Sequence, residues 1–438
     1  MQIDTTRKAG TERQLNRKIT KRIMPILALG MFISYIDRAN LGVISEPLSL
    51  DLGLTASSFA LAAGFFYIGY LVLEVPSNMA LAKYGARFWL GRIMLTWGAV
   101  TVLMSLMQTE WSLHVMRFLL GAAEAGYSPG VILYLAMWYS PKALGKAVAA
   151  LNLAVPVALC LGTVITTLIL TMDGIAGIAG WRWVFVLEGL PAIALAIIIF
   201  INLPSSPAKA KWLTEEEKVM LEASVTQSKS EASHRLSQIP KMLKKGSVWF
   251  FALTYFLILA GFWSITYFLP TIVKEQFGLG VIGSGFLSSV PWLVSIAVMA
   301  IVAKTTVATG DRTWHMTGLM VASAVGLFLG VVSGSPVASL VGMSLAAAGF
   351  FGVLSTFQAT IAQVYAGALA AVSIAFVNAV GNVSGLVGPY ILGYFKDLTG
   401  STDTGLLIMS GSFALAAVCV FFGTRWADKR TGGISGLV

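Results

Sequence analysis

Apolar runs of twenty or more residues recur along almost the whole chain of 438 residues. Runs of this length cross the hydrocarbon core of a bilayer as helices. Charged residues make up only 11% of the sequence, too few to cover the surface of a soluble protein of this size. We therefore predict an all-α integral membrane protein with twelve transmembrane helices. The predicted spans are 23–44, 58–80, 88–107, 113–139, 146–171, 181–203, 247–273, 282–304, 314–332, 337–365, 369–395 and 404–425.

The placement of the basic residues predicts how the chain lies in its membrane. The formal net charge is +10, and most of the 30 Lys and Arg residues lie in the two tails or in alternate loops. This alternation is the positive-inside pattern of membrane proteins, not the clustered basic face of a nucleic-acid-binding protein. We expect a multi-pass protein embedded in the lipid bilayer, with both termini cytoplasmic and with no nucleic-acid partner.

Residues 204–246 depart from the membrane composition and divide the chain into two parts. In this segment Thr214 is followed three residues later by Glu217, a capping-box pattern that predicts a short amphipathic helix. About 40 residues cannot bury a core of their own, so we interpret the segment as a linker. The expected organisation is a basic cytoplasmic tail (1–22), an N-terminal six-helix half (23–203), the cytoplasmic linker (204–246), a C-terminal six-helix half (247–425) and a cytoplasmic tail (426–438).

No constellation of an enzyme or of a cofactor site stands out in the sequence. The three histidines have no partner at metal-ligand spacing, so we expect no metal site, no cofactor and no enzymatic activity. The segment Gly278–Gly283 matches G-x-G-x-x-G by letters, but it lies in a turn between two predicted spans rather than after a strand. Cys160 and Cys419 each lie in an apolar run, which favours free thiols over a disulfide.

Ionisable residues within the predicted spans are the strongest functional signal. A charged group in the hydrocarbon costs at least ~2.5–3.5 kcal/mol, so each one is a candidate functional residue. Arg117 and Glu124 are seven residues apart, which brings them within about 20° of one helix face. Asp37 and Arg38 lie at a similar depth in the first span. The four residues therefore predict either one shared site or structural ion pairs between two helices.

Several uncharged polar residues could line the same cavity between the two halves. Tyr35 and Tyr70 belong to the first two spans, Gln358 to the tenth, and Asn378 and Asn382 to the eleventh. We predict that these five residues contact the substrate. For the tyrosines, packing at a helix interface with a local hydrogen bond is an equally good interpretation.

Three segments resemble the anion:cation symporters of the major facilitator superfamily, and the similarity extends over the whole chain. The segments are Tyr35-Ile36-Asp37-Arg38-Ala39-Asn40, Arg117-Phe118-Leu119-Leu120-Gly121-Ala122-Ala123-Glu124-Ala125-Gly126 and Gly180-Trp181-Arg182-Trp183-Val184-Phe185, the last followed by Glu188-Gly189. The chain looks most like bacterial permeases for tartrate, phthalate and hydroxyphenylacetate. The resemblance implies two six-helix halves of the major facilitator type in a bacterial inner membrane. It also implies that Asp37 and Glu124 couple protons and that Arg38 and Arg117 bind the anion.

The sequence departs from that family in the loops where an inner gate is expected. Asn78 and Ala82 stand at positions of the loop between spans two and three where Gly and Asp are usual. Val307 and Ala308 stand where the second half commonly has an Asp-Arg pair. We therefore expect the inner gate to lack its usual carboxylates.

These features together predict a proton-coupled symporter that imports a small organic anion by alternating access. The expected substrate is a carboxylate such as a hydroxy acid, a sugar acid or an aromatic acid, and no obligate protein partner is implied. An anion or organophosphate exchanger of the same fold is an alternative. A multidrug/proton antiporter fits less well, because two arginines at the site disfavour a cationic substrate. A transporter-like receptor without flux is an alternative from another class.

Overall fold

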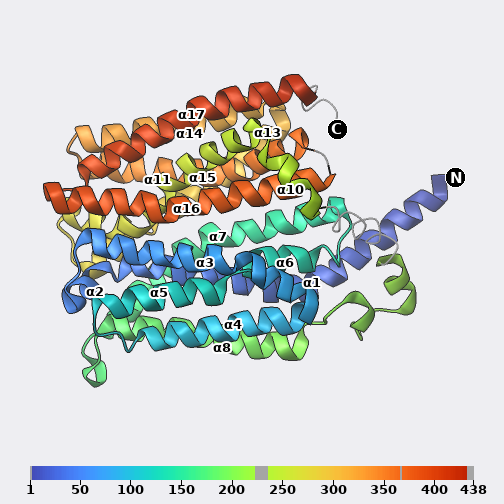
Figure 1. Cartoon of the computed structure of the whole chain (residues 1–438), viewed down its shortest axis with the longest axis horizontal. Coiled ribbons are helices and arrows are strands. Elements are labelled where there is room, and N and C mark those ends of the chain that lie inside the picture. The colour runs from blue at the N-terminus through green and yellow to red at the C-terminus, as the bar shows by residue number, and fades with distance from the viewer. Residues whose placement is uncertain (1, 222–234, 366, 432–438) are drawn as a thin grey trace.

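The computed structural model describes residues 2–221, 235–365 and 367–431, and these form helices joined by short connections (Figure 1). Helix α1 begins and α17 ends at the same end of the bundle, here called the terminal end; the opposite end is called the distal end. The helices are α1 (Gln2–Val43), α2 (Ser45–Leu52), α3 (Ala56–Tyr84), α4 (Ala86–Met104), α5 (Glu110–Glu124), α6 (Tyr127–Leu135), α7 (Pro141–Leu170), α8 (Gly180–Asn202), α10 (Arg235–Leu243), α11 (Gly246–Phe277), α12 (Val281–Leu287), α13 (Val290–Thr309), α14 (Arg312–Val332), α15 (Pro336–Val364), α16 (Gly367–Thr399) and α17 (Asp403–Thr431).

The prediction of an all-α membrane protein is confirmed. Within the described residues, 11 helical segments are long and apolar enough to cross a bilayer. The remaining predicted span is α4, which has 19 residues and packs along α8. Its length of about 28 Å nearly matches the hydrocarbon core, while Arg87 and Arg92 near its start lower its mean hydropathy. With α4 included, the twelve predicted spans are all present as helices.

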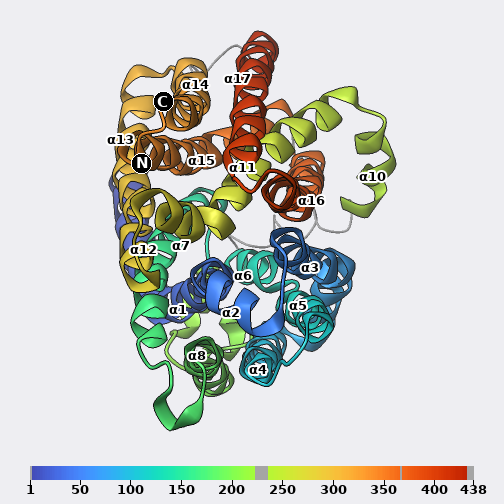
Figure 2. The ribbon, with the colours of Figure 1, turned by 90° about the vertical axis from the view of Figure 1, so that its left-hand side faces the viewer.

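The helices gather into two groups, with the substrate path expected between them. Helices α1 to α8 lie on one side and α11 to α17 on the other (Figures 1 and 2). Helix α3 packs against α16, and α7 packs against α12 and α13, so the two groups touch through these elements. We call the groups the N-terminal half and the C-terminal half.

The segment between the halves begins as the capping-box pattern predicts. The Thr214 backbone N–H donates to Glu217 Oε2 at 2.9 Å, and the Glu217 N–H donates to Thr214 Oγ1 at 3.3 Å. Lys18 on α1 also donates to Glu217, at 2.7 Å. Desolvation alone would raise the pKa of the Glu217 carboxyl, but the hydrogen bonds from Lys18 and Thr214 hold this pKa below its usual value. The exact limits of the linker and of the C-terminal tail stay predictions, because residues 222–234 and 432–438 lie outside the described residues.

The fourth span is not the continuous helix that its apolar run predicts. Helix α5 ends at Glu124, and α6 begins at Tyr127 after Gly126, which has φ +85°. A side chain strongly disfavours this backbone conformation, whereas glycine adopts it without strain. A Cβ at Gly126 would also lie 2.4 Å from Ser77 Oγ on α3. The glycine therefore permits a break next to one of the charged residues within the membrane.

Candidate functional site

Arg38 of α1 and Glu124 of α5 form a buried ion pair. Arg38 Nη2 lies 2.5 Å and Arg38 Nε 3.2 Å from Glu124 Oε1, and Ser34 donates to the same oxygen at 2.6 Å. Only 8% of Arg38 and 1% of Glu124 are exposed. Charge-assisted hydrogen bonds of this length are strong, and removal of either partner leaves an uncompensated charge that costs about 3–5 kcal/mol.

An aromatic wall surrounds the Arg38 guanidinium. Its central carbon lies 5.1 Å from the ring centres of Tyr35 and Phe66 and 5.5 Å from that of Tyr70. These distances fit cation–π attraction, which is stronger where water is excluded. The wall therefore holds the guanidinium in place while its Nε and Nη2 donate to Glu124. The predicted residues Tyr35 and Tyr70 are thus brought to Arg38.

Arg117 of α5 is fully buried, with an exposed fraction of 0%. Among the described residues, none of its three guanidinium nitrogens has a hydrogen-bond partner. Its central carbon lies 4.9 Å from the Phe66 ring, so Phe66 contacts both arginines. A buried guanidinium with unmet donors is costly in the absence of an anion. The donors of Arg117 are therefore available to a negatively charged ligand next to Arg38.

Asp37 points away from the two arginines, which differs from the expected meeting of four charged residues. Its Oδ2 accepts a hydrogen bond from Trp97 Nε1 and lies 3.4 Å from Thr101 Oγ1, both on α4. Consecutive residues on a helix project about 100° apart, so Asp37 and Arg38 reach different neighbours. Asp37 Oδ1 is buried and has no hydrogen-bond partner among the described residues. The structure therefore separates Asp37, on the α4 side of α1, from the Arg38–Glu124 pair.

Glu188 of α8 is a second buried acid on this side of α1, and it is absent from the residues that the sequence singled out as the site. Asn40 Nδ2 donates to Glu188 Oε2 at 2.8 Å, and Thr166 of α7 donates to Oε1 at 2.6 Å. Only 1% of Asp37 and 5% of Glu188 are exposed. Within the described residues, neither of these buried acids forms an ion pair. The sequence signal for Glu188 was an acid within an apolar span. Its partner Asn40 lies one helical turn after Asp37 in the sequence.

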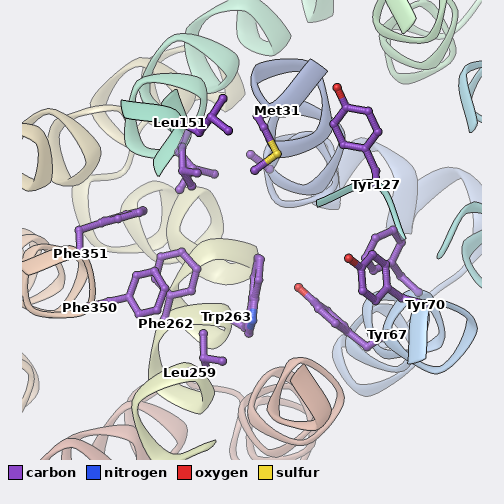
Figure 3. Close-up of a cluster of buried hydrophobic side chains, with 14 of the residues drawn as sticks. Met31, Tyr67, Tyr70, Tyr127, Leu151, Leu259, Phe262, Trp263, Phe350 and Phe351 are labelled. Carbon is purple, nitrogen blue, oxygen red and sulfur yellow. The ribbon is translucent and has the colours of Figure 1, made fainter. Parts of the chain in front are cut away.

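The polar residues predicted in the C-terminal half do not reach the arginines. Gln358 on α15 and Asn378 and Asn382 on α16 are half-buried, and the structure gives these three side chains no hydrogen bond within its described part. Figure 3 shows instead that aromatic side chains of α11 and α15 lie opposite Tyr67 of α3. The Tyr67 and Trp263 ring centres are 5.2 Å apart. The nearest wall of the C-terminal half is therefore aromatic.

Ionic and polar contacts join the two halves at the distal end. Lys274 of α11 forms an ion pair with Glu46 of α2, and Ser45 Oγ lies 3.0 Å from Thr271 Oγ1. Asp397 of α16 accepts hydrogen bonds of 2.8 Å from the first two backbone N–H groups of α3. These contacts surround a cavity of about 780 Å³ at the distal surface. Deeper between the halves, Tyr67 Oη lies 3.4 Å from Tyr267 Oη.

The terminal end has a different set of polar contacts, and those named here among the described residues each stay within one half. Arg87 of α4 donates to the Phe200 carbonyl at 2.6 Å, and Arg312 of α14 forms an ion pair with Asp428 of α17. Asn78 donates to the Glu74 carbonyl on its own helix. The side chain of Val307 lies outside the described residues. Within the described part of the chain, no group of three His, Cys, Asp or Glu side chains could hold a metal ion.

Comparisons with known proteins agree with this architecture. Residues 27–389 match the family model described as Major Facilitator Superfamily. A protein of Agrobacterium vitis named "Putative tartrate transporter" is 36% identical over 427 residues, which cover 97% of this chain and 98% of the relative. A quinolone resistance transporter of Acinetobacter baumannii is 37% identical over 400 residues, which cover 91% and 92%.

A solved structure extends the comparison to three dimensions. A bacterial homologue of the human lysosomal transporter Spinster, in an inward-facing and unoccupied conformation, has a TM-score of 0.75 with 15% sequence identity. The match covers 95% of this chain and 98% of that chain, so the two share their fold. With the family match over most of its length, this chain belongs to the major facilitator superfamily of membrane transporters.

Proposed function

We propose that the chain is a proton-coupled symporter that imports a small organic carboxylate across a bacterial inner membrane, with both termini in the cytoplasm. The observation that carries this proposal is Arg117, a fully buried guanidinium without a hydrogen-bond partner among the described residues. It shares the Phe66 ring with Arg38, whose carboxylate partner is Glu124. Two adjacent guanidinium groups, only one of them neutralised, favour an anion with at least one carboxylate.

The ion pair suggests how a proton and an anion are coupled. When Glu124 is ionised, it occupies Arg38 through Oε1. Protonation of Glu124 removes the charge that holds this pair, so a substrate carboxylate can accept the N–H groups of Arg38 and Arg117 together. Release of the proton restores the Arg38–Glu124 pair and displaces the anion. The cost of leaving Arg38 unpaired, about 3–5 kcal/mol, makes the two events interdependent.

Asp37 is proposed as a second proton-binding residue that acts from behind α1. It is one residue from Arg38 but contacts Trp97 and Thr101 of α4. A proton on Asp37 Oδ1 would turn this unpartnered oxygen into a hydrogen-bond donor, which then requires a nearby acceptor. Asn40 Oδ1 is such an acceptor by type, and it is likewise buried without a partner among the described residues. Movement of α1 is then the link between this acid and the anion site.

Alternating access requires the distal contacts to break. The Glu46–Lys274 pair and the bonds from Asp397 to the start of α3 join the halves on the side that we assign to the periplasm. While these contacts are formed, the carrier is closed at the distal end. Rocking of the halves about the Tyr67–Tyr267 level would open the site to the other side.

The relatives suggest which carboxylates to test first. The relative from Agrobacterium vitis is named "Putative tartrate transporter", and a hydroxy dicarboxylate of that kind offers one carboxylate for each arginine. Export driven by protons is the second candidate, because another relative is named a quinolone resistance transporter. Both candidates use the same arginines but differ in the direction of net transport.

Proton entry into proteoliposomes tests the proposal. The purified chain is reconstituted with a pH-sensitive dye inside, and tartrate, other carboxylates, phosphate esters and organic cations are added outside. We expect at least one carboxylate to acidify the lumen through wild-type protein but not through Arg117→Gln or in protein-free liposomes. Uptake of a labelled acid without any proton movement would contradict symport. Alkalinisation on addition of a substrate would favour the antiport candidate.

A further inference from the structure

A second cavity lies at the terminal end of the C-terminal half, away from the two arginines of the N-terminal half. It has a volume of about 570 Å³ and lies between the start of α11 and the end of α17. Nothing in the proposed transport cycle uses it. The residues that carry the argument are Lys245, Gly246, Phe250, Phe422, Trp426 and Arg430.

Two cationic side chains line the mouth of this cavity. Lys245 immediately precedes α11, and Arg430 lies in the last turn of α17. Asp428, the acid nearest to Arg430 in the sequence, is bound to Arg312, with its Oδ1 3.1 Å from Arg312 Nε. Among the described residues, neither Lys245 nor Arg430 forms an ion pair. Among the described residues, no acid at the mouth of the cavity therefore pairs with either cation.

Aromatic side chains form the deeper part of the cavity. Phe250 lies four residues into α11, and Phe422 lies eight residues before Arg430, which correspond to about 6 Å and 12 Å along the helices. Phe422 is 62% exposed, so within its apolar span it lies on the outer surface of the protein, where lipid chains are expected. Along α17, Trp426 lies between Phe422 and Arg430, and its ring is 4.4 Å from the Arg430 guanidinium carbon. Charge at the membrane surface followed by apolar rings deeper in the bilayer is the order of groups in a phospholipid.

We propose that this cavity binds one anionic phospholipid. Its phosphate lies between Lys245 and Arg430, and one acyl chain lies along Phe250 and Phe422. A zwitterionic lipid binds more weakly, because its ammonium group lies close to the same two cations. A free phosphate ester binds more weakly too, because it leaves the aromatic part of the cavity without an apolar partner.

Native mass spectrometry of the delipidated full-length protein tests this proposal. The probes are phosphatidylglycerol and phosphatidylcholine with identical acyl chains, added at matched concentrations. We expect phosphatidylglycerol to bind wild-type protein more tightly, and the double variant Lys245→Gln/Arg430→Gln to lose about tenfold or more of that affinity. Gly246→Leu keeps both charges but places a side chain in the cavity, and a Cβ at Gly246 meets no other atom within 4 Å. This variant should also lose phosphatidylglycerol binding.

Arg425→Gln is the matched control. Arg425 lies on the same helix, is exposed and stacks at 4.3 Å on Phe421, but it does not line the cavity. We expect this variant to bind phosphatidylglycerol as wild type does. Equal binding of the two lipids to wild type, equal losses in Arg425→Gln and in the double variant, or full binding by Gly246→Leu would each overturn the proposal. Competition by glycerol phosphate at the concentration of the lipid would overturn the role of the acyl chain.

Discussion

Arg38 and Glu124 meet across two helices, with Arg38 Nη2 2.5 Å from Glu124 Oε1, at the residue where α5 ends. The pair lies beside Arg117, whose guanidinium has no hydrogen-bond partner among the described residues. The site thus contains one neutralised and one unneutralised cation within a single aromatic environment. In the proposed mechanism, an anion that enters this site competes with Glu124 for Arg38 while it satisfies Arg117.

The two arginines should differ in what their removal does to stability. Arg117→Gln removes a buried charge without an ion-pair partner, so we expect the thermal stability of the substrate-free protein to stay equal or to rise. Arg38→Gln leaves Glu124 without its cation and should lower the free energy of unfolding by about 3 kcal/mol. Thermal unfolding of both variants in the same detergent measures this difference. Equal destabilisation by the two substitutions would contradict the assignment of Arg117 as an unpaired cation.

The same two substitutions should both weaken substrate binding. A lost charge-assisted hydrogen bond is worth about 1.5–3 kcal/mol, so we expect each variant to bind the carboxylate about 10-fold to 100-fold more weakly. Arg182→Gln is a suitable control, because Arg182 is a span-six arginine that donates to the Ser105 carbonyl at 2.5 Å rather than to an acid. Calorimetric titration with the transported acid gives the dissociation constants. Normal affinity in Arg117→Gln would remove the main support for the anion site.

Asp37→Asn should separate proton coupling from folding. Asparagine keeps a carbonyl oxygen for the Trp97 and Thr101 donors, so the variant should unfold within a few degrees of wild type. It cannot take up and release a proton, so we expect it to lose accumulation of the acid against a gradient. Uptake driven by a pH gradient, measured beside thermal unfolding, tests this expectation. Full accumulation in Asp37→Asn would show that its carboxyl does not carry a coupled proton.

The spans and the presence of charges near the middle of the membrane could be predicted from the sequence, because length and hydropathy report these directly. The orientation, which rests on loop charge, stays a prediction. Helical spacing placed Glu124 on one face with Arg117, whereas the structure pairs Glu124 with Arg38 and leaves the Arg117 guanidinium without a hydrogen-bond partner among the described residues. The predicted site did not separate Asp37 from Arg38, although two consecutive residues on a helix cannot share one face. The contacts of Asp37 with α4 and of Glu188 with α1 and α7 depend on helix rotation, which apolar spans rich in Leu, Ala and Val do not specify.

A disulfide across the distal contacts should lock the carrier. Ser45 Oγ and Thr271 Oγ1 are 3.0 Å apart on α2 and α11, so cysteines at these two positions lie within bonding reach. We expect oxidised Ser45→Cys/Thr271→Cys to stop transport and dithiothreitol to restore it. Neither Ser45→Cys alone nor Thr271→Cys alone should respond to oxidant. Undiminished transport by the fully cross-linked protein would contradict opening at the distal end.

The break between α5 and α6 should depend on its glycine. Gly126→Ala forces an alanine into φ +85° with its Cβ 2.4 Å from Ser77 Oγ, and we expect a loss of stability of about 1–3 kcal/mol and of most transport. Gly145→Ala on α7 is the control, because a Cβ there meets no other atom within 4 Å. Thermal unfolding and uptake are measured for both. An unchanged Gly126→Ala protein would mean that the break does not require this conformation.

The break also shows a limit of prediction from hydropathy. Residues 113–139 form one apolar run, so hydropathy predicts a single helix, although Pro129 lies three residues after Gly126. At Gly126 the backbone has φ +85°, and α3 lies so close that a Cβ would be 2.4 Å from Ser77 Oγ. Glycine is common in membrane helices as a packing residue, so its presence alone does not identify a break.

The most direct test of the account compares two transport modes in Glu124→Gln. Proteoliposomes are assayed for proton-driven accumulation of the labelled acid and for its counterflow, in which unlabelled acid inside exchanges for labelled acid outside without net proton movement. Glu110→Gln, on the same helix and exposed at its distal end, is the control. We predict that Glu124→Gln retains counterflow and loses accumulation, whereas Glu110→Gln retains both. Accumulation by Glu124→Gln at the wild-type level would contradict the claim that protonation of Glu124 admits the anion to Arg38.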